Sequence, residues 1–295
     1  MFGMRSATIP AACLAVGLAL CGCKSSGGGP GDAATGDGPK AGCPSNPEDL
    51  ISDFESDNSL AAVGGRQGGW YTYGDDVGMF DRASGFNIDT GNPNCSPVGS
   101  LHIKGTGFAM WGAATGVDWK PRPGDGDGGY EAKMTYDASA YRGIAFWAKA
   151  DKMLDGVQVS FPDLYTDNAA PKHDMPDPLD PSMFMCMDCV CEYAAGFPNN
   201  CSPYLVQFGK KGDAAADVAF SGYSGVQVDT TWKRFQVLFV DTKQDPGNGG
   251  YHTPTNKLDV AHLTAMAIQI NADYSTGSAR ANDFEIWIDD VHFIR

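Results

Sequence analysis

Glutamate and basic residues are both scarce in this chain of 295 residues. Only five of its 36 acidic residues are Glu, and Lys and Arg together number 21, so the formal net charge is −15. Such a surface repels nucleic acid and gives no electrostatic attraction to anionic lipid. Abundant Asp beside 38 Gly favours turns and calcium ligation, whereas helices would favour Glu.

Motifs of hydrolytic enzymes are also missing. The sequence contains no H-E-x-x-H and no G-x-S-x-G, and its five His are dispersed. Hydrolysis of polysaccharides usually requires two carboxylates across a cleft. The five Glu are scattered, and adjacent acids such as Asp75 and Asp76 would face opposite ways on a strand. We therefore expect no catalytic activity.

A single long apolar run stands at the N-terminus. Arg5 precedes an apolar stretch at residues 7–20 that is too short to span a bilayer as a mature helix, so residues 1–22 are predicted to be a signal peptide. Cleavage would remove Arg5 and no acidic residue, so the mature chain is one charge more negative.

The end of this run, Leu20-Cys21-Gly22-Cys23, resembles the bacterial lipobox, with Cys23 as the lipidated residue. An ordinary secretory signal with an accidental Cys is the alternative. Lipidation would attach the protein to a membrane, and Lys24 after the Cys favours the outer membrane of the cell envelope. Residues 23–47 are rich in Gly, Ser, Ala and Asp and predict a disordered, flexible tether to an extracytoplasmic domain.

The remaining residues, 48–295, have the length of one large all-β domain. Apolar and polar residues alternate at residues 157–161, 234–239 and 266–270, which predicts strands, and residues 101–104 and 108–111 are further candidates. Residues 258–263 would make one short helical turn. Many short strands between Gly- and Asp-rich turns predict a β-sandwich. Residues 162–203 are too long for a simple connection and predict an excursion over one end of it.

Six cysteines remain once Cys13 and Cys21 leave with the signal and Cys23 is assigned to lipid. An even number in an exported chain predicts disulfides, and the preferred pair by position is Cys43 with Cys95. The other four would then pair among themselves, although four thiolates within sixteen residues could instead bind zinc; they are Cys186, Cys189, Cys191 and Cys201.

The last twelve residues, 284–295, contain a break in their alternation. Phe284, Ile286 and Ile288 share one parity, whereas Val291 and Phe293 share the other. A slip of one residue predicts a β-bulge, which would re-aim a carboxylate at Asp289-Asp290. That carboxylate either lies in solvent on an edge or is buried against a partner such as a metal ion. Residues 50–55 predict another strand with its own carboxylate.

Four segments together resemble the galactose-binding-like jelly roll. They are DFE at residues 53–55, GIAFWAKA at 143–150, TWKRFQVLF at 231–239 and IDDV at 288–291. This fold is used by many carbohydrate-binding modules, including family eleven and the group of families four and twenty-two. The resemblance covers roughly residues 48–295 and implies a jelly-roll β-sandwich that binds carbohydrate.

The resemblance also implies a structural calcium ion. In such modules the ion commonly bridges a Glu of the first strand and an Asp of the last, which by motif are Glu55 and Asp289. Asp290 is the fallback ligand, because the predicted bulge makes the register uncertain by one residue.

Aromatic residues are the best candidates for ligand contact. Sugars stack their apolar faces on exposed aromatic rings beside polar acceptors. Residues 69–76 have that composition, with Trp70, Tyr71 and Tyr73 as candidate stacking residues and Asp75 or Asp76 as acceptors. Core packing is the alternative for Trp70. Trp111 and Trp119 are candidates to line a groove.

We therefore expect a lipid-anchored, monomeric domain that binds a glycan or polysaccharide without catalysis. Two other classes stay open: a scaffold or adhesion lipoprotein that binds protein, and a glycan-active hydrolase. An exposed aromatic platform would favour glycan, whereas a flat apolar patch would favour protein.

Overall fold

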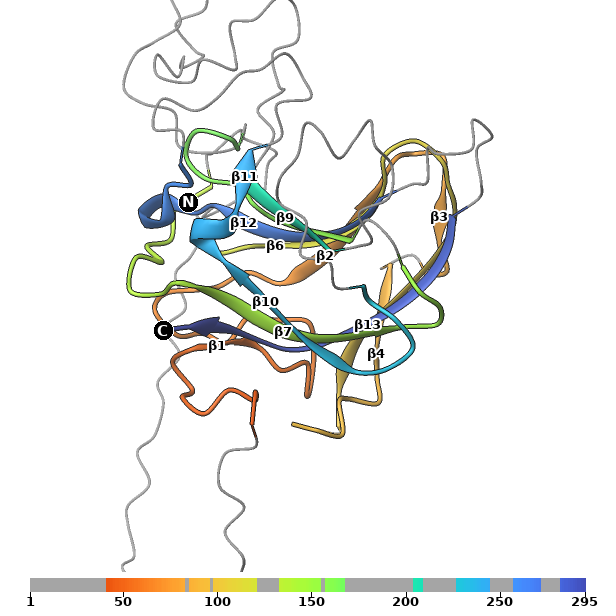
Figure 1. Cartoon of the computed structure of the whole chain (residues 1–295), viewed down its shortest axis with the longest axis horizontal. Helices are drawn as coiled ribbons and strands as arrows, with labels where there is room; N and C mark the ends of the chain where they lie inside the picture. The colour runs from red at the N-terminus through yellow and green to blue at the C-terminus, as the bar shows by residue number, and fades with distance from the viewer. Residues whose placement is uncertain are drawn as a thin grey trace, which may run out of the picture. The chain divides into compact units, whose positions relative to one another are not determined.

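Strands whose residues alternate between apolar and polar form two stacked antiparallel sheets (Figure 1). The structure is a computed structural model that describes residues 41–82, 85–95, 98–120, 133–154, 157–167, 204–208, 227–244, 257–271 and 282–295. All of these residues belong to one compact unit, Pro39–Arg295. The predicted all-β sandwich is confirmed.

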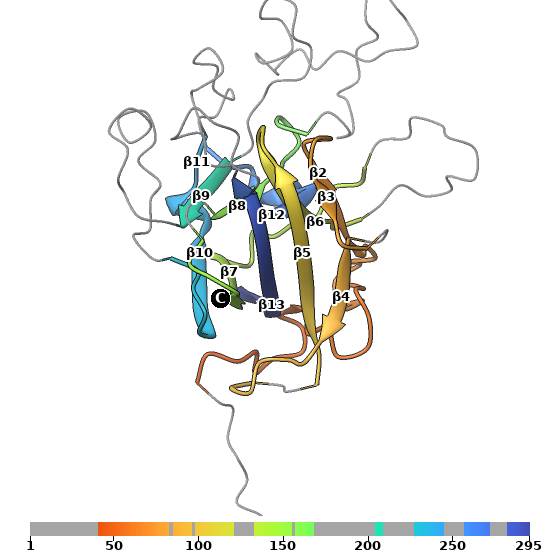
Figure 2. The same ribbon diagram turned by 90° about the vertical axis from the view of Figure 1, so that its right-hand side faces the viewer.

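The first sheet is built around the long strand β13 (Asn282–Ile294), which pairs with three other strands. Figure 2 shows β13 and β5 side by side, with β4 on the far side of β5. The sheet order is β10 (Lys233–Leu238), β7 (Gly143–Ala150), β13, β5 (Ser100–Phe108) and β3 (Met79–Phe80), while β1 (Leu50–Ser52) pairs with β13 and β4 (Phe86–Asp89) pairs with β5.

The second sheet carries the other half of the core. Its order is β11 (Lys243–Gln244), β9 (Tyr204–Phe208), β8 (Val157–Phe161), β12 (Ala265–Asn271), β6 (Gly112–Asp118) and β2 (Trp70–Gly74). Of two short 3-10 helices, η2 (Phe239–Asp241) follows β10 and η4 (Val260–His262) precedes β12. The helix η4 confirms the short helical turn predicted at residues 258–263.

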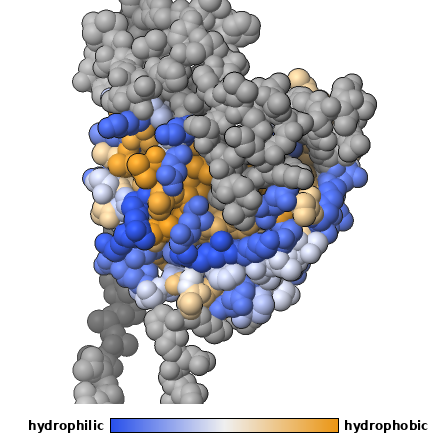
Figure 3. Space-filling model, viewed as in Figure 1, coloured by the Kyte–Doolittle hydropathy of each residue, from blue (hydrophilic) through white to orange (hydrophobic). Residues whose placement is uncertain are grey.

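The core lies where the inner faces of the two sheets meet. Ile103 and Ile288 of the first sheet and Val159 and Ile268 of the second belong to one buried apolar cluster. Figure 3 shows apolar residues gathered on the side of the molecule seen in Figure 1, with hydrophilic residues around them. Among the described residues, no helix is long and apolar enough to cross a bilayer.

Two predicted strands have different bounds in the structure. Residues 109–111 form no strand, because Gly107 and Gly112 have φ angles of +77° and +108° and turn the chain between β5 and β6. The first strand stops at Ser52, because Phe54 has a φ of +53° and leaves the extended conformation.

Two other predictions of local structure are confirmed. The pairing of β13 with β7 shifts register between Asp289 and His292, which is the predicted bulge. A disulfide joins Cys43 to Cys95. This bond ties the start of the described chain to the loop that precedes β5.

Candidate functional site

The outer face of the second sheet carries exposed aromatic side chains on its edge strand, β2. Alternation along β2 turns Trp70 into the core and places Tyr71 and Tyr73 on the outer face. These two tyrosines are 38% and 40% exposed. A pair of large rings on one outer face is a candidate contact surface.

Small residues of the neighbouring strand lie beside both rings. Tyr71 pairs with Gly116 of β6, and Tyr73 pairs with Ala114. A Cβ atom added to Gly116 would stand 3.4 Å from Cε1 of Tyr73 and 3.2 Å from the carbonyl oxygen of Met266. The Tyr73 ring therefore lies close to the sheet, and a larger residue at 116 would push it away.

A third ring extends the pair into a row. Trp111 ends the turn that leads into β6, and its ring centroid is 5.8 Å from that of Tyr73. The Tyr71 and Tyr73 centroids are also 5.8 Å apart. Successive rings are tilted by 38° and 41°, so the row is twisted rather than flat. We call Tyr71, Tyr73 and Trp111 the aromatic row.

A chain of polar contacts begins at the Tyr71 end of the aromatic row. The Tyr71 hydroxyl donates to Oδ1 of Asp118 at 3.0 Å, and Nζ of Lys133 is 2.9 Å from the same oxygen. Lys133 also contacts Oδ2 of Asp167 at 3.2 Å, which accepts a hydrogen bond from Oγ1 of Thr264 at 2.7 Å. Acceptors and a cationic donor therefore lie beside the rings.

Amide side chains lie at the other end of the row. Nε2 of Gln269 donates to the carbonyl oxygen of Trp111 at 3.4 Å and to Oδ1 of Asn271 at 2.7 Å. Gln269 pairs with Ala114 on one side and with Gln158 of β8 on the other, so both glutamines lie on the same face as the tyrosines. Polar groups thus border the aromatic row at both ends.

The electrostatic surroundings keep the tyrosines neutral and the lysine charged. Burial and the negative charge of Asp118 raise the pKa of Tyr73 to about 12 and also raise the pKa of Tyr71. Burial acts to lower the pKa of Lys133, but Asp167 and Asp118 outweigh it and raise that pKa. At neutral pH this face therefore offers phenol hydroxyls, carboxylates and an ammonium group.

Two tryptophans that we considered for ligand contact belong to the core. Trp70 is 2% exposed, packs against Phe54 and donates its indole N–H to Oγ of Ser52 at 2.9 Å. Trp119 is fully buried. Neither can stack on a ligand, so the expectation for Trp70 as a stacking residue is corrected, because alternation turns it inward.

The predicted acceptors Asp75 and Asp76 do not join the aromatic row. Asp75 is 4% exposed, and burial acts to raise its pKa, but backbone hydrogen bonds outweigh burial and lower it. Asp76 is exposed and has a φ of +61°. The carboxylate of Asp75 is committed to holding its loop, since it accepts from the N–H groups of Val77, Gly78, Ala109, Met110 and Gly112.

A second cluster of interest lies at the bulge in β13. Asp289 and Asp290 are 0% and 3% exposed. Oδ1 of Asp289 accepts from the N–H of Asp290 at 2.8 Å, and its Oδ2 accepts from the N–H of Asn92 at 2.7 Å. Asp290 has a φ of +50°, a conformation that costs free energy in a non-glycine residue.

Carboxylates near β1 approach this pair. The charge of Glu55 raises the pKa of both aspartates, and Asp53 adds to the effect on Asp290. Burial is the largest cause, and it acts with these charges to raise the pKa of Asp289 to about 8 and that of Asp290 to about 7. Oε1 of Glu55 and Oδ2 of Asp290 are buried and have no hydrogen-bond partner.

These orphaned oxygens determine how a cation would fit. Buried carboxylate oxygens without donors are suitable ligands for calcium, which prefers oxygen. Among the described residues, however, no three Asp, Glu, His or Cys side chains converge with the geometry of a metal centre. Any ion at this cluster would therefore have to draw the carboxylates together or take backbone oxygens as further ligands.

Other predicted sites lie outside the described residues. They include the lipidation site Cys23, most of the excursion at residues 162–203, and the cysteines Cys186, Cys189, Cys191 and Cys201. The choice between disulfides and zinc for those four residues stays a prediction.

Comparisons with known proteins give fold likeness at low identity. No protein-family model and no curated protein matches the chain. A family 11 carbohydrate-binding module from a cellulosomal cellulase of Clostridium thermocellum has a TM-score of 0.43 and 12% identity, over 83% of this chain and 92% of its own. A family 11 module from Clostridium thermocellum in complex with a β-1,3-1,4-mixed-linked tetrasaccharide also has a TM-score of 0.43 and 12% identity. This match covers 83% of this chain and 94% of that module.

A family 30 carbohydrate-binding module gives a weaker likeness. Its TM-score is 0.37 at 14% identity, over 76% of this chain and 80% of its own. Membership of either family does not follow from these values.

The Asp289–Asp290 pair should make the metal-free protein less stable as pH rises. Both folded-state pKa values are raised, so the folded state holds protons that the unfolded state has released above about pH 4. The stability that this protonation provides is lost progressively from about pH 4 up to the folded-state pKa values of about 7 and about 8, and the loss levels off above them. One carboxyl contributes at most about 1.4 kcal/mol per pH unit to this loss.

Urea unfolding in EDTA between about pH 5 and about pH 9 measures this loss. His292 acts in the opposite sense, because burial lowers its pKa and stability rises with pH up to the unfolded value. The informative quantity is therefore the difference between the wild type and Asp290→Asn, which should grow between about pH 5 and about pH 7 and level off above about pH 8. A constant difference across that range would contradict the raised pKa values.

Proposed function

We propose that this protein binds a glycan, without catalysis, on the outer face of its second sheet. The observation that carries the proposal is the aromatic row, whose exposed rings are flanked by Asp118 and Lys133 at one end and Gln269 at the other. A sugar ring presents an apolar face to an aromatic ring while its hydroxyl groups both donate and accept hydrogen bonds. This face supplies both kinds of partner within one surface.

The arrangement favours binding over hydrolysis. Asp118 and Asp167 are the carboxylates that contact Lys133 beside the row, and both are engaged with its ammonium group. A general acid must instead hold a proton to give to the leaving group. Oxygen atoms of carboxylates held in this way accept hydrogen bonds from sugar hydroxyls.

We expect each ring of the aromatic row to contribute separately to glycan affinity. Tyr73→Ala or Trp111→Ala should weaken binding roughly threefold to tenfold, because a ring contact is worth about 0.5–1.5 kcal/mol. Pull-down on insoluble polysaccharides, followed by calorimetry with soluble fragments, gives the affinity. Both tyrosines are partly exposed, so Tyr73→Ala should leave the melting temperature almost unchanged.

Two variants control this experiment. Tyr71→Phe keeps the ring and removes the hydroxyl that donates to Asp118, so it separates stacking from hydrogen bonding. Trp232→Ala removes an aromatic ring that lies under Lys149 immediately before β10 of the first sheet, and it should not affect binding. Retention of full affinity by both Tyr73→Ala and Trp111→Ala, or no binding to any polysaccharide, would move the function to protein binding.

We also propose that calcium binds between β1 and β13. The orphaned oxygens of Glu55 and Asp290 support this, and Asp289 would orient the site through its backbone hydrogen bonds. The ion would offset the charge of the buried carboxylates and the strain at Asp290.

Calcium should therefore raise the melting temperature and EDTA should lower it. A ligand present at about 100 times its Kd stabilises the folded state by about 2.7 kcal/mol. Asp290→Asn and Glu55→Gln should each remove the calcium-dependent shift, while Glu48→Gln, an exposed glutamate near the same end, should retain it. An unchanged shift in both cluster variants would show that calcium binds elsewhere.

We propose finally that Cys23 is lipidated and anchors the protein to the outer membrane. The lipobox-like sequence at residues 20–23 supports this, and an acidic domain offers no other attraction to anionic lipid. Cys23→Ala should release the protein into the soluble fraction after cell lysis. Cys21→Ala should remain in the membrane fraction, and release of both variants to the same extent would argue against lipidation at Cys23.

A further inference from the structure

A pocket of about 470 Å³ lies on the outer face of the first sheet, whereas the aromatic row lies on the second sheet. The edge strand β4 forms one wall, and β5 contributes His102. Asn87 pairs with His102 and shares its side of the sheet with Asp89 two residues later. The lining residues are Arg82, Phe86, Asn87, Ile88, Asp89 and His102.

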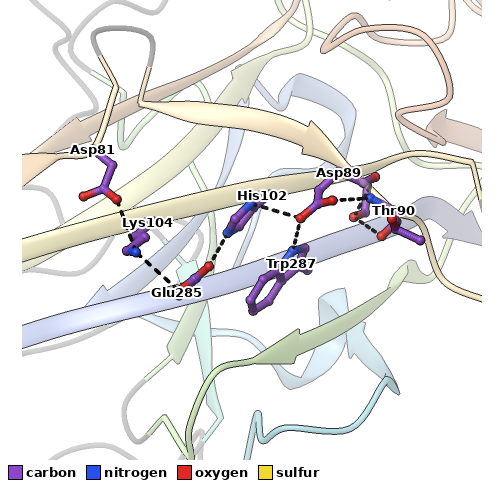
Figure 4. A network of polar contacts seen from close by, with 8 residues as sticks. Asp81, Asp89, Thr90, His102, Lys104, Glu285 and Trp287 are labelled. Atoms are coloured by element: carbon purple, nitrogen blue, oxygen red, sulfur yellow. Dashed lines mark hydrogen bonds and ion pairs between the residues drawn. The ribbon is translucent and has the colours of Figure 1, made fainter.

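The polar side of this pocket is held in place by a network of contacts (Figure 4). The His102 ring stacks on Trp287 with centroids 4.4 Å apart and planes 10° apart. Trp287 donates its indole N–H to Oδ2 of Asp89 at 3.1 Å, and Nε2 of His102 lies 2.9 Å from Oε1 of Glu285. Lys104 bridges Glu285 and Asp81 further along the sheet. Asp89 and His102 are therefore fixed before any ligand arrives.

Two polar groups of the pocket remain without partners. Oδ1 of Asn87 is buried and accepts no hydrogen bond. Within the described part of the chain, the exposed guanidinium of Arg82 has no carboxylate partner, since the neighbouring Asp81 pairs with Lys104. A buried acceptor without a donor is destabilising, so this geometry favours a ligand that supplies a hydrogen.

These two groups set the chemistry of the ligand. It must donate to Asn87 and accept from Arg82, and hydroxyl groups do both. A carboxylate or phosphate would satisfy Arg82 but would bring no hydrogen to Asn87, and it would lie near the negative charges of Asp89 and Glu285. Phe86 and Ile88 also line the pocket, although alternation along β4 turns their side chains to the side opposite Asn87 and Asp89.

We propose that this pocket is a second carbohydrate site, which binds a neutral mono- or disaccharide unit through adjacent hydroxyl groups. Its volume lies within the range of about 300–1,000 Å³ that is typical of small-molecule pockets. The ligand class is the same as in the proposed function, but the site stands on the opposite sheet and rests on different residues. Failure of one site would therefore leave the other intact.

The indole N–H of Trp287 reports directly on this pocket, because its acceptor Asp89 lines the wall. The chain has six tryptophans, so the indole region of a ¹H–¹⁵N spectrum is simple, and Trp287→Phe assigns the signal. The purified protein is titrated with glucose, galactose, mannose and xylose, and in parallel with glucuronate and galacturonate. At least one neutral sugar should shift the Trp287 signal to saturation, with Kd on the order of millimolar.

Variants assign the shift to the pocket. Arg82→Ala and Asn87→Ala should each weaken the titration at least roughly tenfold, corresponding to the loss of one good polar contact. Arg142→Ala removes an exposed arginine elsewhere and should titrate as the wild type does. Tyr73→Ala should keep the Trp287 response even where it loses polysaccharide binding, which separates this site from the aromatic row.

Three results would overturn the proposal. They are no saturable Trp287 shift with any neutral sugar, an unchanged titration in both Arg82→Ala and Asn87→Ala, and tighter binding of a uronate than of its neutral parent sugar. The last result would assign the pocket to anionic ligands through Arg82 alone.

Discussion

The register of β13 is the constraint on which the first sheet depends. This strand pairs with β5, β7 and β1, so its inward residues must fit the core while its backbone satisfies three partners. Ile286 and Ile288 face the core before the bulge, and Val291 and Phe293 face it afterwards. Without the extra residue at Asp289–Asp290, one of these two sets would turn outward.

The bulge also explains why carboxylates are buried there. The left-handed conformation of Asp290 and the two backbone hydrogen bonds accepted by Asp289 hold both acids inside the sheet. Phe54 has a similar conformation next to Glu55, so both sides of the cluster have strained backbone. Several carboxylates buried close together are unfavourable unless protons or a cation neutralise their charge. Calcium binding would therefore couple the closure of β1 on β13 to the calcium concentration around the protein.

Sequence alone predicted the features that follow from strand alternation. Strands β8, β10 and β12, the bulge in β13 and the Cys43–Cys95 disulfide all follow from local pattern or residue count. Alternation also distinguishes Trp70 from Tyr71 and Tyr73, once the inward parity of β2 is known. Asp118 could have been found from the sequence, because it is the last residue of β6 and alternation places it on the same face as Ala114 and Gly116.

The rest depends on contacts between segments that are distant in sequence. Lys133 contacts both Asp118 and Asp167, which lie on separate segments, and no spacing rule connects the three residues. The pocket on the first sheet requires the register of β4 against β5, which places Asn87 beside His102. Asp75 looked like a free acceptor beside two tyrosines, but only the fold shows that five backbone N–H groups surround it.

The first described residues pack against the outer face of the first sheet. The carbonyl oxygen of Gly42 accepts from Nε1 of Trp147 at 3.3 Å and from Nε of Arg234 at 2.9 Å, and the disulfide of Cys43 fixes the next residue. Trp147 and Arg234 are paired residues of β7 and β10 that point outward from the first sheet. Gly42 therefore lies against the outer face of the first sheet, whereas the aromatic row lies on the second sheet.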